Sequence, residues 1–201
     1  MNVLCNDPEI FYIDNFLTHD ECNLIIKLSQ DNMKPASVSF LDKDKDKYST
    51  NIYKGRTNSS YWLPHDHHPV LNDIVQRISS KLDCNSKCFE SFQIIHYKLN
   101  EHYAFHYDAY NINHKEKYDK FCKNNGNRIY TVLTYLNDVE EGGATAFDKL
   151  PEYLEVQPKK GRMVVFKNIN DDGSLNLKSR HAGLPVIKGE KWAFNLWLRE
   201  K

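Results

Sequence analysis

The segment from residue 191 to residue 199 constrains the fold of this chain more than any other part of its sequence. Every second position is apolar: Trp192, Phe194, Leu196 and Leu198. The positions between them add an amine (Lys191), an amide (Asn195), an indole (Trp197) and a guanidinium (Arg199). A period of two predicts a β-strand whose apolar face is buried, here under helices. The polar face looks either into water or into a polar cavity, and the pattern alone does not choose between them.

Two helices are predicted before most of the strands. Thr18 and Glu21 form a capping box at the start of the first helix, and the second begins near Pro69. From about Phe89 onward, segments rich in β-branched and aromatic residues predict strands at residues 92–99, 129–137, 153–156, 162–166 and 191–199. We therefore expect one domain over residues 1–201, mainly β with supporting helices. The helices fall mainly in residues 15–85 and the strands mainly in residues 86–200.

Three polar segments, at residues 41–55, 111–127 and 168–176, are expected to be loops. The simplest interpretation is that each is a solvated connection between regular elements. The alternative is that one of them folds over a substrate, because binding loops are commonly carried on a rigid scaffold.

Charge and composition limit the possible partners and compartments. The chain has 27 basic and 27 acidic residues, so a protein that binds nucleic acid by neutralising phosphates is disfavoured. No apolar stretch approaches the roughly 20 residues that span a bilayer, and no signal peptide is visible. The five cysteines show no CxxC spacing. We expect a cytoplasmic monomer, in the host cytoplasm if the Asn-rich composition reflects a viral genome.

His106 and Asp108 provide the first chemical signal. On a strand, residues two apart point to the same face, so the imidazole and the carboxylate converge. Together they supply two of the three ligands of a two-histidine, one-carboxylate iron site, and His181 could provide the third from a distant strand. A surface His and Asp on an exposed strand is the alternative. His102 and His106 have helical spacing, but the aromatic sequence around them is typical of a strand. The cluster at residues 65–68 is expected to be solvent-exposed.

A second group of residues suits a carboxylate. An iron enzyme that uses 2-oxoglutarate needs a fixed cation, and Lys191 lies on the polar face of the last strand. Thr145 and Tyr97 are candidate hydroxyl partners. The alternative for Lys191 is an ordinary exposed lysine at the start of a strand.

With these residues in place, the chain resembles the catalytic domain of the prolyl 4-hydroxylases, which are Fe(II)/2-oxoglutarate dioxygenases. The likeness extends from Phe11 to about Arg199. It rests on the matching stretches at residues 56–60, 90–93, 97–108, 128–138, 141–147, 181–186 and 189–197. Their order and spacing agree over nearly the whole chain, and together they are far more specific than the His106–Asp108 pair alone.

The resemblance implies a double-stranded β-helix, or jelly roll, in which His106, Asp108 and His181 ligate Fe(II). It also implies that Lys191, Thr145 and Tyr97 hold 2-oxoglutarate. A substrate groove for a proline-containing peptide would be lined by Arg56, Glu90, Tyr103, Arg128 and Trp197.

The implied reaction is the 4-hydroxylation of peptidyl proline with O2 and 2-oxoglutarate, giving succinate and CO2, with ascorbate as reductant. Two alternatives stay open. One is an enzyme of the same fold that acts on a lysyl side chain or a free amino acid. The other is a catalytically silent peptide-binding module.

Overall fold

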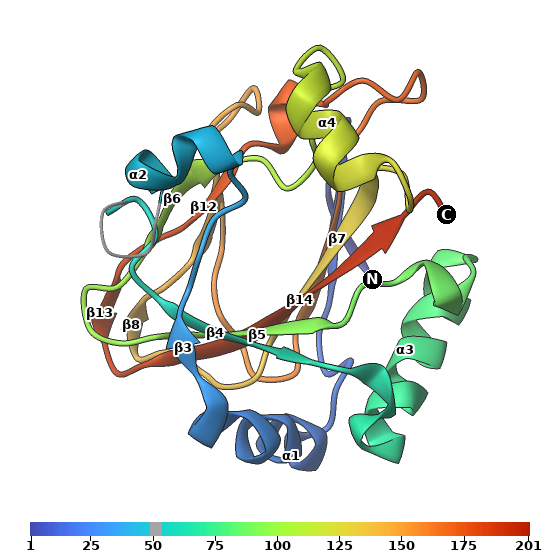
Figure 1. The fold of residues 1–201 in the computed structure, drawn as a ribbon. Coiled ribbons are helices and arrows are strands. Elements are labelled where there is room, and N and C mark those ends of the chain that lie inside the picture. The colour runs from blue at the N-terminus through green and yellow to red at the C-terminus, as the bar shows by residue number, and fades with distance from the viewer. Residues whose placement is uncertain (49–53) are drawn as a thin grey trace.

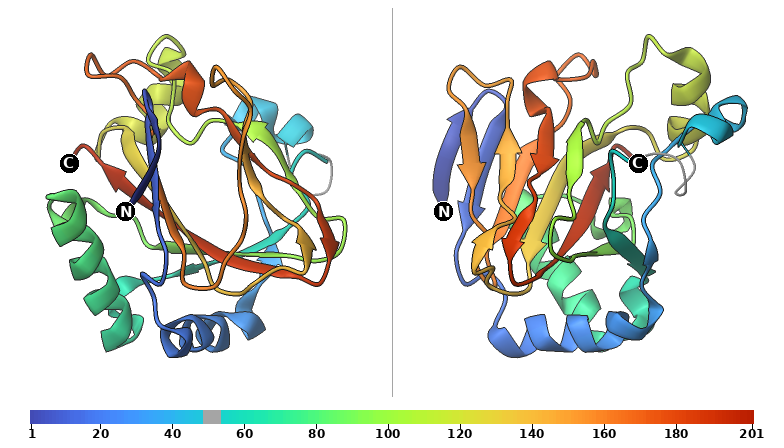
Figure 2. Two further views of the ribbon diagram at one scale, coloured as in Figure 1. Left: turned by 180° about the vertical axis from the view of Figure 1, so that it is seen from behind. Right: turned by 90° about the vertical axis from the view of Figure 1, so that its left-hand side faces the viewer.

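Two antiparallel sheets face each other across the interior of the molecule (Figures 1 and 2). The structure is a computed structural model that describes residues 1–48 and 54–201. In spatial order the larger sheet consists of β1 (Asn2–Asn6), β2 (Glu9–Ile13), β11 (Met163–Lys167), β7 (Arg128–Tyr135), β14 (Lys191–Arg199), β5 (Phe92–Tyr97), β4 (Ser59–Leu63) and β3 (Lys34–Pro35). The last strand of the chain, β14, therefore lies inside this sheet, between β7 and β5.

The smaller sheet carries His106 and His181, the two histidines that the sequence marks as metal ligands. In spatial order its strands are β10 (Leu154–Val156), β9 (Thr145–Phe147), β12 (His181–Gly183) and β6 (Tyr103–His106). A separate pair, β13 (Val186–Lys188) and β8 (Glu141–Gly142), extends the structure at one end. The predicted strands are thus present, each within about three residues of its expected bounds.

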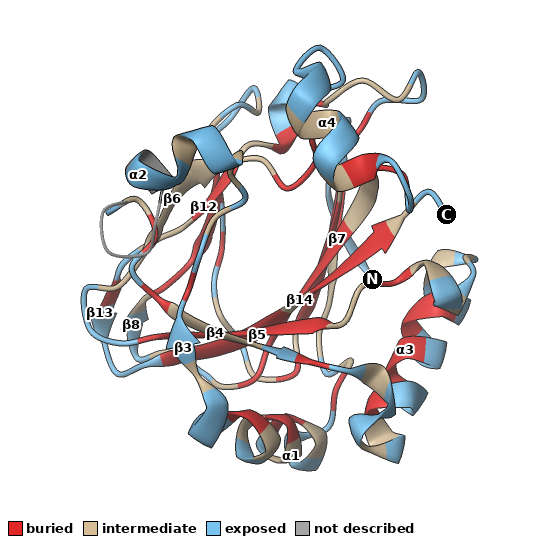
Figure 3. Ribbon diagram, in the orientation of Figure 1, coloured by how far each residue is buried: buried red, intermediate tan, exposed pale blue. Residues whose placement is uncertain are grey.

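Helices α1 (His19–Ser29) and α3 (Pro69–Leu82) cover the outer face of the larger sheet (Figure 3). The predicted capping box is confirmed, because the Thr18 side chain accepts from the Glu21 amide and the Glu21 carboxylate accepts from the Thr18 amide. The apolar face of β14 packs in the core beneath these helices. That cluster includes Ile25, Leu71, Ile74, Ile78, Trp192, Phe194, Leu196 and Leu198.

The other face of β14 looks into the interior between the sheets, which answers the question that the sequence left open. Lys191 is only 2% exposed, and Ala193 joins a second core cluster with Tyr97 and Tyr135. Further along the strand, Asn195 and Trp197 line a large groove. One strand thus stabilises the helical layer with one face and supplies polar groups to the interior with the other.

Two of the three predicted loops contain helical turns. Residues 111–127 include α4 (Lys115–Cys122), so the expectation of a loop is wrong there. The helix is anchored by buried Cys122 and by Phe121, whose ring stacks on Tyr110 with centroids 5.0 Å apart. The segment at residues 41–55 begins with η2 (Asp42–Asp44) and α2 (Lys45–Tyr48), and its residues 49–53 lie outside the described part of the chain.

The short 3-10 turns are η1 (Gln30–Asn32), η3 (His65–His67), η4 (Ser86–Cys88) and η5 (Leu177–Ser179). The hairpin β1–β2 was not predicted, and β2 completes the core by pairing with β11. Within the described residues, no helix has the length and apolar character needed to cross a bilayer.

Candidate active site

Three metal-ligating side chains meet where β6 and β12 pair. His106 lies opposite His181 in the register of these strands, and Asp108 follows β6 by two residues. Their ligand atoms all lie within 4.8 Å of one another, and no other such group of three or more occurs in residues 1–48 and 54–201. The structure thus brings together the residues that the sequence selected, and the surface-pair alternative is wrong because Asp108 and His181 are buried.

Both imidazoles are held in the orientation that a metal ligand requires. The ring nitrogen Nδ1 of His106 lies 2.8 Å from the Ala104 carbonyl, and Nδ1 of His181 lies 2.9 Å from the Ser179 carbonyl. A carbonyl oxygen only accepts, so each Nδ1 donates its proton to the backbone, and Nε2 is the ring atom that faces Asp108 as a potential ligand. The two Nε2 atoms each lie 3.5 Å from a different oxygen of Asp108. This donor set fits Fe(II).

The protonation states also suit a metal site. Burial lowers the pKa of His181 to about 4, so the ring is neutral at physiological pH. Burial alone would raise the pKa of Asp108, but the two imidazoles and Arg128 outweigh it and hold that pKa well below its usual range. The carboxylate is therefore charged and able to ligate a cation.

Two polar residues that sequence reasoning missed hold Asp108 in place. The Thr131 hydroxyl donates to Asp108 Oδ2 at 2.7 Å, and the Asn168 amide donates to the Thr131 hydroxyl at 2.8 Å. Thr131 and Tyr135 share the inner face of β7, where they pair with Trp197 and Ala193 of β14. The period of two that identified the polar face of β14 would also have identified Thr131 and Tyr135 on β7.

Lys191 is a buried amine, so its interpretation as an exposed lysine is wrong. Its Nζ donates to the Gly143 carbonyl at 2.7 Å and lies 5.0 Å and 5.3 Å from the ring centres of Tyr97 and Tyr135. Burial lowers the pKa of Lys191 to about 7. An amine buried with a single hydrogen-bond partner is suited to an anionic ligand, which would restore the favourable charged state.

Hydroxyl groups gather near the same amine. Thr145 is buried on β9, and its hydroxyl is hydrogen-bonded to that of Tyr135 at 2.7 Å. Tyr97 is also buried, and burial raises its pKa to about 12, which keeps its hydroxyl protonated. The Tyr97 hydroxyl comes so close to Gly183 that a Cβ there would lie 3.2 Å from it, tighter than ordinary contacts. Tyr135 is a further candidate that the sequence did not single out.

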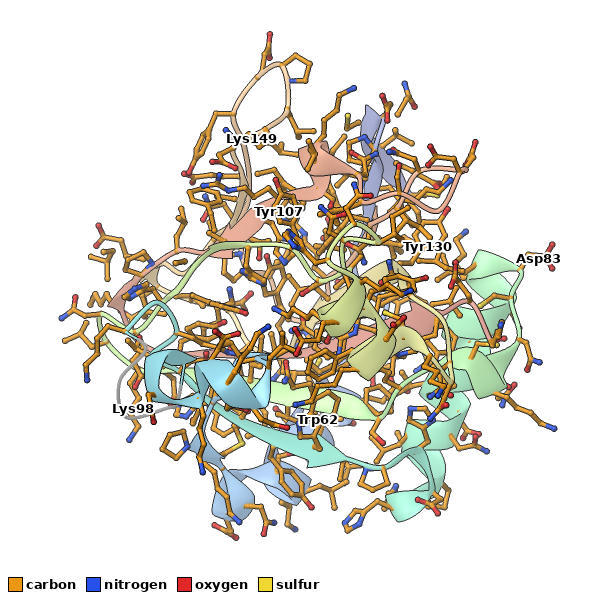
Figure 4. All side chains as sticks on the ribbon, turned by 45° about the horizontal axis from the view of Figure 1, so that its top comes forward. Trp62, Asp83, Lys98, Tyr107, Tyr130 and Lys149 are labelled. Carbon is orange, nitrogen blue, oxygen red and sulfur yellow. The ribbon has the colours of Figure 1, made fainter. Side chains whose placement is uncertain are left out.

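A groove of about 1170 Å³ is lined by two of the three ligands, His106 and Asp108. Its walls include four of the five predicted substrate residues: Arg56, Tyr103, Arg128 and Trp197. Tyr103 stacks on His106 with ring centres 3.6 Å apart, and the Arg128 guanidinium lies 3.6 Å from the Trp197 ring. Figure 4 labels two further lining residues, Trp62 on β4 and Tyr107 between the first two ligands.

Glu90, the fifth predicted substrate residue, is engaged by arginines. Its carboxylate accepts from Arg128 at 2.6 Å and 2.8 Å, and from Arg199 at 2.7 Å. Arg199 also donates to the carbonyls of Phe121 and Gly126, at the end of α4. Glu90 therefore fixes Arg128 against the groove and ties α4 to the sheet.

The groove also has a wall made from the two segments that were expected to be loops. In Figure 2, α2 and α4 lie at the same end of the molecule, and residues of η2 form ion pairs with α4. Lys43 pairs with Glu116, and Lys120 pairs with Asp42 at 2.8 Å. These exposed ion pairs join chain segments more than 70 residues apart.

The other histidines that the sequence analysis considered join no metal-ligating group within residues 1–48 and 54–201. His65 in η3 lies with Nε2 2.6 Å from the Glu90 carbonyl, and His68 caps α3 by accepting from the Val70 amide. His65 and His68 are both partly buried, so the expected solvent exposure holds only for Asp66 and His67. His102 and His106 do not form a helical pair despite their spacing, because His106 is the last residue of strand β6.

Comparison with known proteins identifies the family. The model of the 2OG-Fe(II) oxygenase superfamily matches residues 92–199. Probable prolyl 4-hydroxylase 8 of Arabidopsis thaliana is 33% identical over 215 residues, which cover 98% of this chain and 70% of the relative. The chain belongs to the prolyl 4-hydroxylase family. Prolyl 4-hydroxylase 5 of the same plant is 34% identical, again over 98% of this chain and 70% of its own.

Solved prolyl hydroxylases share the fold. The viral collagen prolyl hydroxylase of Paramecium bursaria Chlorella virus-1, solved with 2OG, has a TM-score of 0.72, with 27% identity and coverage of 98% of both chains. A Trichoplax adhaerens prolyl hydroxylase, solved with a hypoxia inducible factor peptide, has a TM-score of 0.65 at 18% identity, over 97% of this chain and 85% of its own. The predicted jelly roll is confirmed.

Proposed function

We infer that this prolyl 4-hydroxylase family member converts peptidyl proline to 4-hydroxyproline, using Fe(II), O2 and 2-oxoglutarate and giving succinate and CO2. The observation that carries this conclusion is the convergence of His106, Asp108 and His181 beside a groove that His106 and Asp108 line, with both Nδ1 atoms held by backbone carbonyls. Family membership supports the same cofactors, with ascorbate as reductant.

Each group has a distinct task in this proposal. His106, Asp108 and His181 would hold Fe(II), which together with 2-oxoglutarate supplies the oxidising chemistry when bound. The Asp108 carboxylate is kept ionised and oriented by its neighbours, which preserves the ligand geometry.

Lys191, Thr145 and Tyr97 would bind the distal carboxylate of 2-oxoglutarate. Lys191 gives the charge, and the two hydroxyls can donate hydrogen bonds to the same oxygens. All three are buried, so water competes weakly for these contacts.

Tyr103, Trp197, Arg56 and Arg128 would position the peptide. Aromatic walls suit proline in the polyproline II conformation, because this extended form costs little entropy to dock. The groove is larger than the few hundred Å³ needed by a free amino acid, which favours a peptide over the free amino acid alternative. Glu90 would act through Arg128, which it holds against Trp197.

The test is mass spectrometry of proline-rich peptides incubated with the protein, Fe(II), 2-oxoglutarate and ascorbate. A gain of about 16 Da on proline, absent with His106→Ala, is the expected result. Lys191→Ala should weaken 2-oxoglutarate binding more than iron binding. Succinate without oxidised proline would redirect the search to lysyl or free amino acid substrates. Bound iron without succinate would favour a silent peptide-binding module and overturn the proposal.

We further propose that the enzyme acts as a cytoplasmic monomer on a protein substrate, without a nucleic-acid or membrane partner. The equal numbers of basic and acidic residues support the absence of a nucleic-acid partner. Light scattering coupled to gel filtration gives the mass in solution, and a mass of twice the chain would contradict the monomer. Imaging of the tagged protein in cells tests the compartment.

A further inference from the structure

Arg56 is a buried cation without an anion. Only 8% of the residue is exposed, and its guanidinium lines the groove. Its three hydrogen bonds go to neutral oxygens: Asn58 Oδ1 at 3.0 Å, the Ser37 carbonyl at 2.9 Å and Gln93 Oε1 at 3.2 Å. The ring of Tyr103 lies 4.5 Å from its Cζ atom.

Among the six arginines of the chain, only Arg56 lacks a carboxylate partner within the described residues. Each of the other arginines forms an ion pair with a carboxylate: Arg77, Arg128, Arg162, Arg180 and Arg199. For Arg56, no carboxylate of residues 1–48 or 54–201 lies within ion-pair distance. Residues 49–53 contain neither aspartate nor glutamate. The chain therefore leaves this charge uncompensated.

The hydrogen-bonding capacity of Arg56 is also incomplete. A guanidinium has five N–H donors, and three are used by the neutral acceptors. One N–H remains on each terminal nitrogen, and a carboxylate can accept from both terminal nitrogens of a guanidinium. A buried charge without a counter-ion is unfavourable. An incoming carboxylate would therefore gain both an ion pair with the guanidinium and hydrogen bonds from its free N–H groups.

We propose that Arg56 selects peptide substrates that carry a carboxylate close to the target proline. This inference rests on the proposed function and adds the chemical class of the substrate. The carboxylate can belong to an aspartate or glutamate side chain or to a peptide C-terminus, because the guanidinium recognises the same group in each.

The geometry limits where the carboxylate lies along the peptide. Arg56 contacts Tyr103, which stacks on His106, so the guanidinium is at most about 8 Å from that ligand ring. An extended peptide advances about 3 Å per residue. The acidic group is therefore expected within two residues of the hydroxylated proline.

The test compares matched peptides in both binding and turnover. One proline-rich peptide receives Glu or Gln at each of the two positions before and after its proline, with both ends blocked. A further pair ends two residues after proline, with a free or amidated C-terminus. Peptide affinity is measured by fluorescence polarisation with the Mn(II)- and 2-oxoglutarate-loaded protein. Hydroxylation rates are measured with Fe(II).

The expected result is about tenfold tighter binding of the Glu peptide at one or more positions, with the preference carried by KM. Arg56→Gln should abolish the preference. Gln93→Glu should also abolish it, because a near-isosteric change places a carboxylate beside Arg56 without removing any contact of the guanidinium. Arg77→Gln, which removes the same charge outside the groove, should leave the preference intact. A preference confined to the free C-terminus would assign the site to peptide ends.

Equal affinity for Glu and Gln at every position and for both C-terminal forms would overturn the inference. The same holds if the preference for Glu persists in Arg56→Gln. Failure of the proposed function is distinct, because the peptides would then bind without any oxidation of proline. The binding assay still decides the role of Arg56 in that case.

Discussion

Because the amine of Lys191 is buried, we expect it to take up a proton when 2-oxoglutarate binds. Its pKa is lowered to about 7 by burial, so at pH 8 the amine in the empty site is about nine-tenths neutral. A carboxylate beside it favours the charged form and returns the pKa toward its usual range. Both carboxylates of 2-oxoglutarate are already ionised at this pH, so the proton must come from the buffer.

The size of the effect follows from the pKa of about 7. Binding should take up about 0.9 proton at pH 8, about 0.5 at pH 7 and about 0.1 at pH 6. The dissociation constant for 2-oxoglutarate should rise about fiftyfold from pH 7 to pH 9, because one pH unit costs about 1.4 kcal/mol once the amine is neutral. Calorimetric titration of the Mn(II)-loaded protein in phosphate and in Tris gives the proton uptake from the difference in heat.

Lys191→Arg is the matched control, because a guanidinium stays charged and should bind 2-oxoglutarate without proton uptake. The same linkage affects stability. Without co-substrate, the unfolded chain binds the proton more tightly, so the free energy of unfolding should increase as the pH rises from about 7 toward 10.5. Heats that are identical in both buffers, together with a flat pH dependence of affinity, would refute the assignment of a neutral amine at this site.

Three substitutions test other contacts. Thr131→Val removes the hydroxyl that orients Asp108, so metal affinity measured by titration should fall about 10- to 100-fold; an unchanged affinity would show that the contact is dispensable. Tyr135→Phe removes the hydroxyl partner of Thr145 and should weaken 2-oxoglutarate binding about fivefold in a calorimetric titration, with iron affinity unchanged. A loss of iron affinity would contradict this role. Thr18→Ala removes the cap of α1 and should lower the melting temperature by about 2–4 °C, and an unaltered melting temperature would refute this contribution.

The elements predicted well from sequence were those whose local pattern and packing agree. Helices α1 and α3 combine capping signals with apolar residues at helical spacing, and β14 alternates along its whole length. Helix α4 lacks such a pattern, because most of its residues are polar and its anchoring depends on Tyr110 and Arg199 from distant segments. The β1–β2 hairpin was not predicted, because its stabilising partner, β11, lies about 150 residues away in the sequence.

Some residues of the candidate site could likewise be predicted from local sequence patterns, and others could not. A strand period of two predicted that His106 and Asp108 converge, and they do, although Asp108 lies two residues beyond the end of β6. The same period put Lys191 on the polar face of its strand, whereas the roles of His181 and Tyr97 rested on the family resemblance. Sequence patterns did not reveal that Glu90 is shared by two arginines or that Arg56 has no carboxylate partner. Such pairing depends on which strands become neighbours, and a single sequence does not encode it locally.

The position of β14 has a consequence for how the chain is made. This strand fills the centre of the larger sheet, between β7 and β5, yet it is synthesised after both of them. Until residues 191–199 emerge from the ribosome, β7 and β5 each present an open edge of unpaired backbone groups, and such edges readily associate with other strands. A ribosome stalled before residue 191 should hold a chain that is protease-sensitive and bound by chaperones. Release of the final nine-residue strand should then close the sheet in one cooperative step.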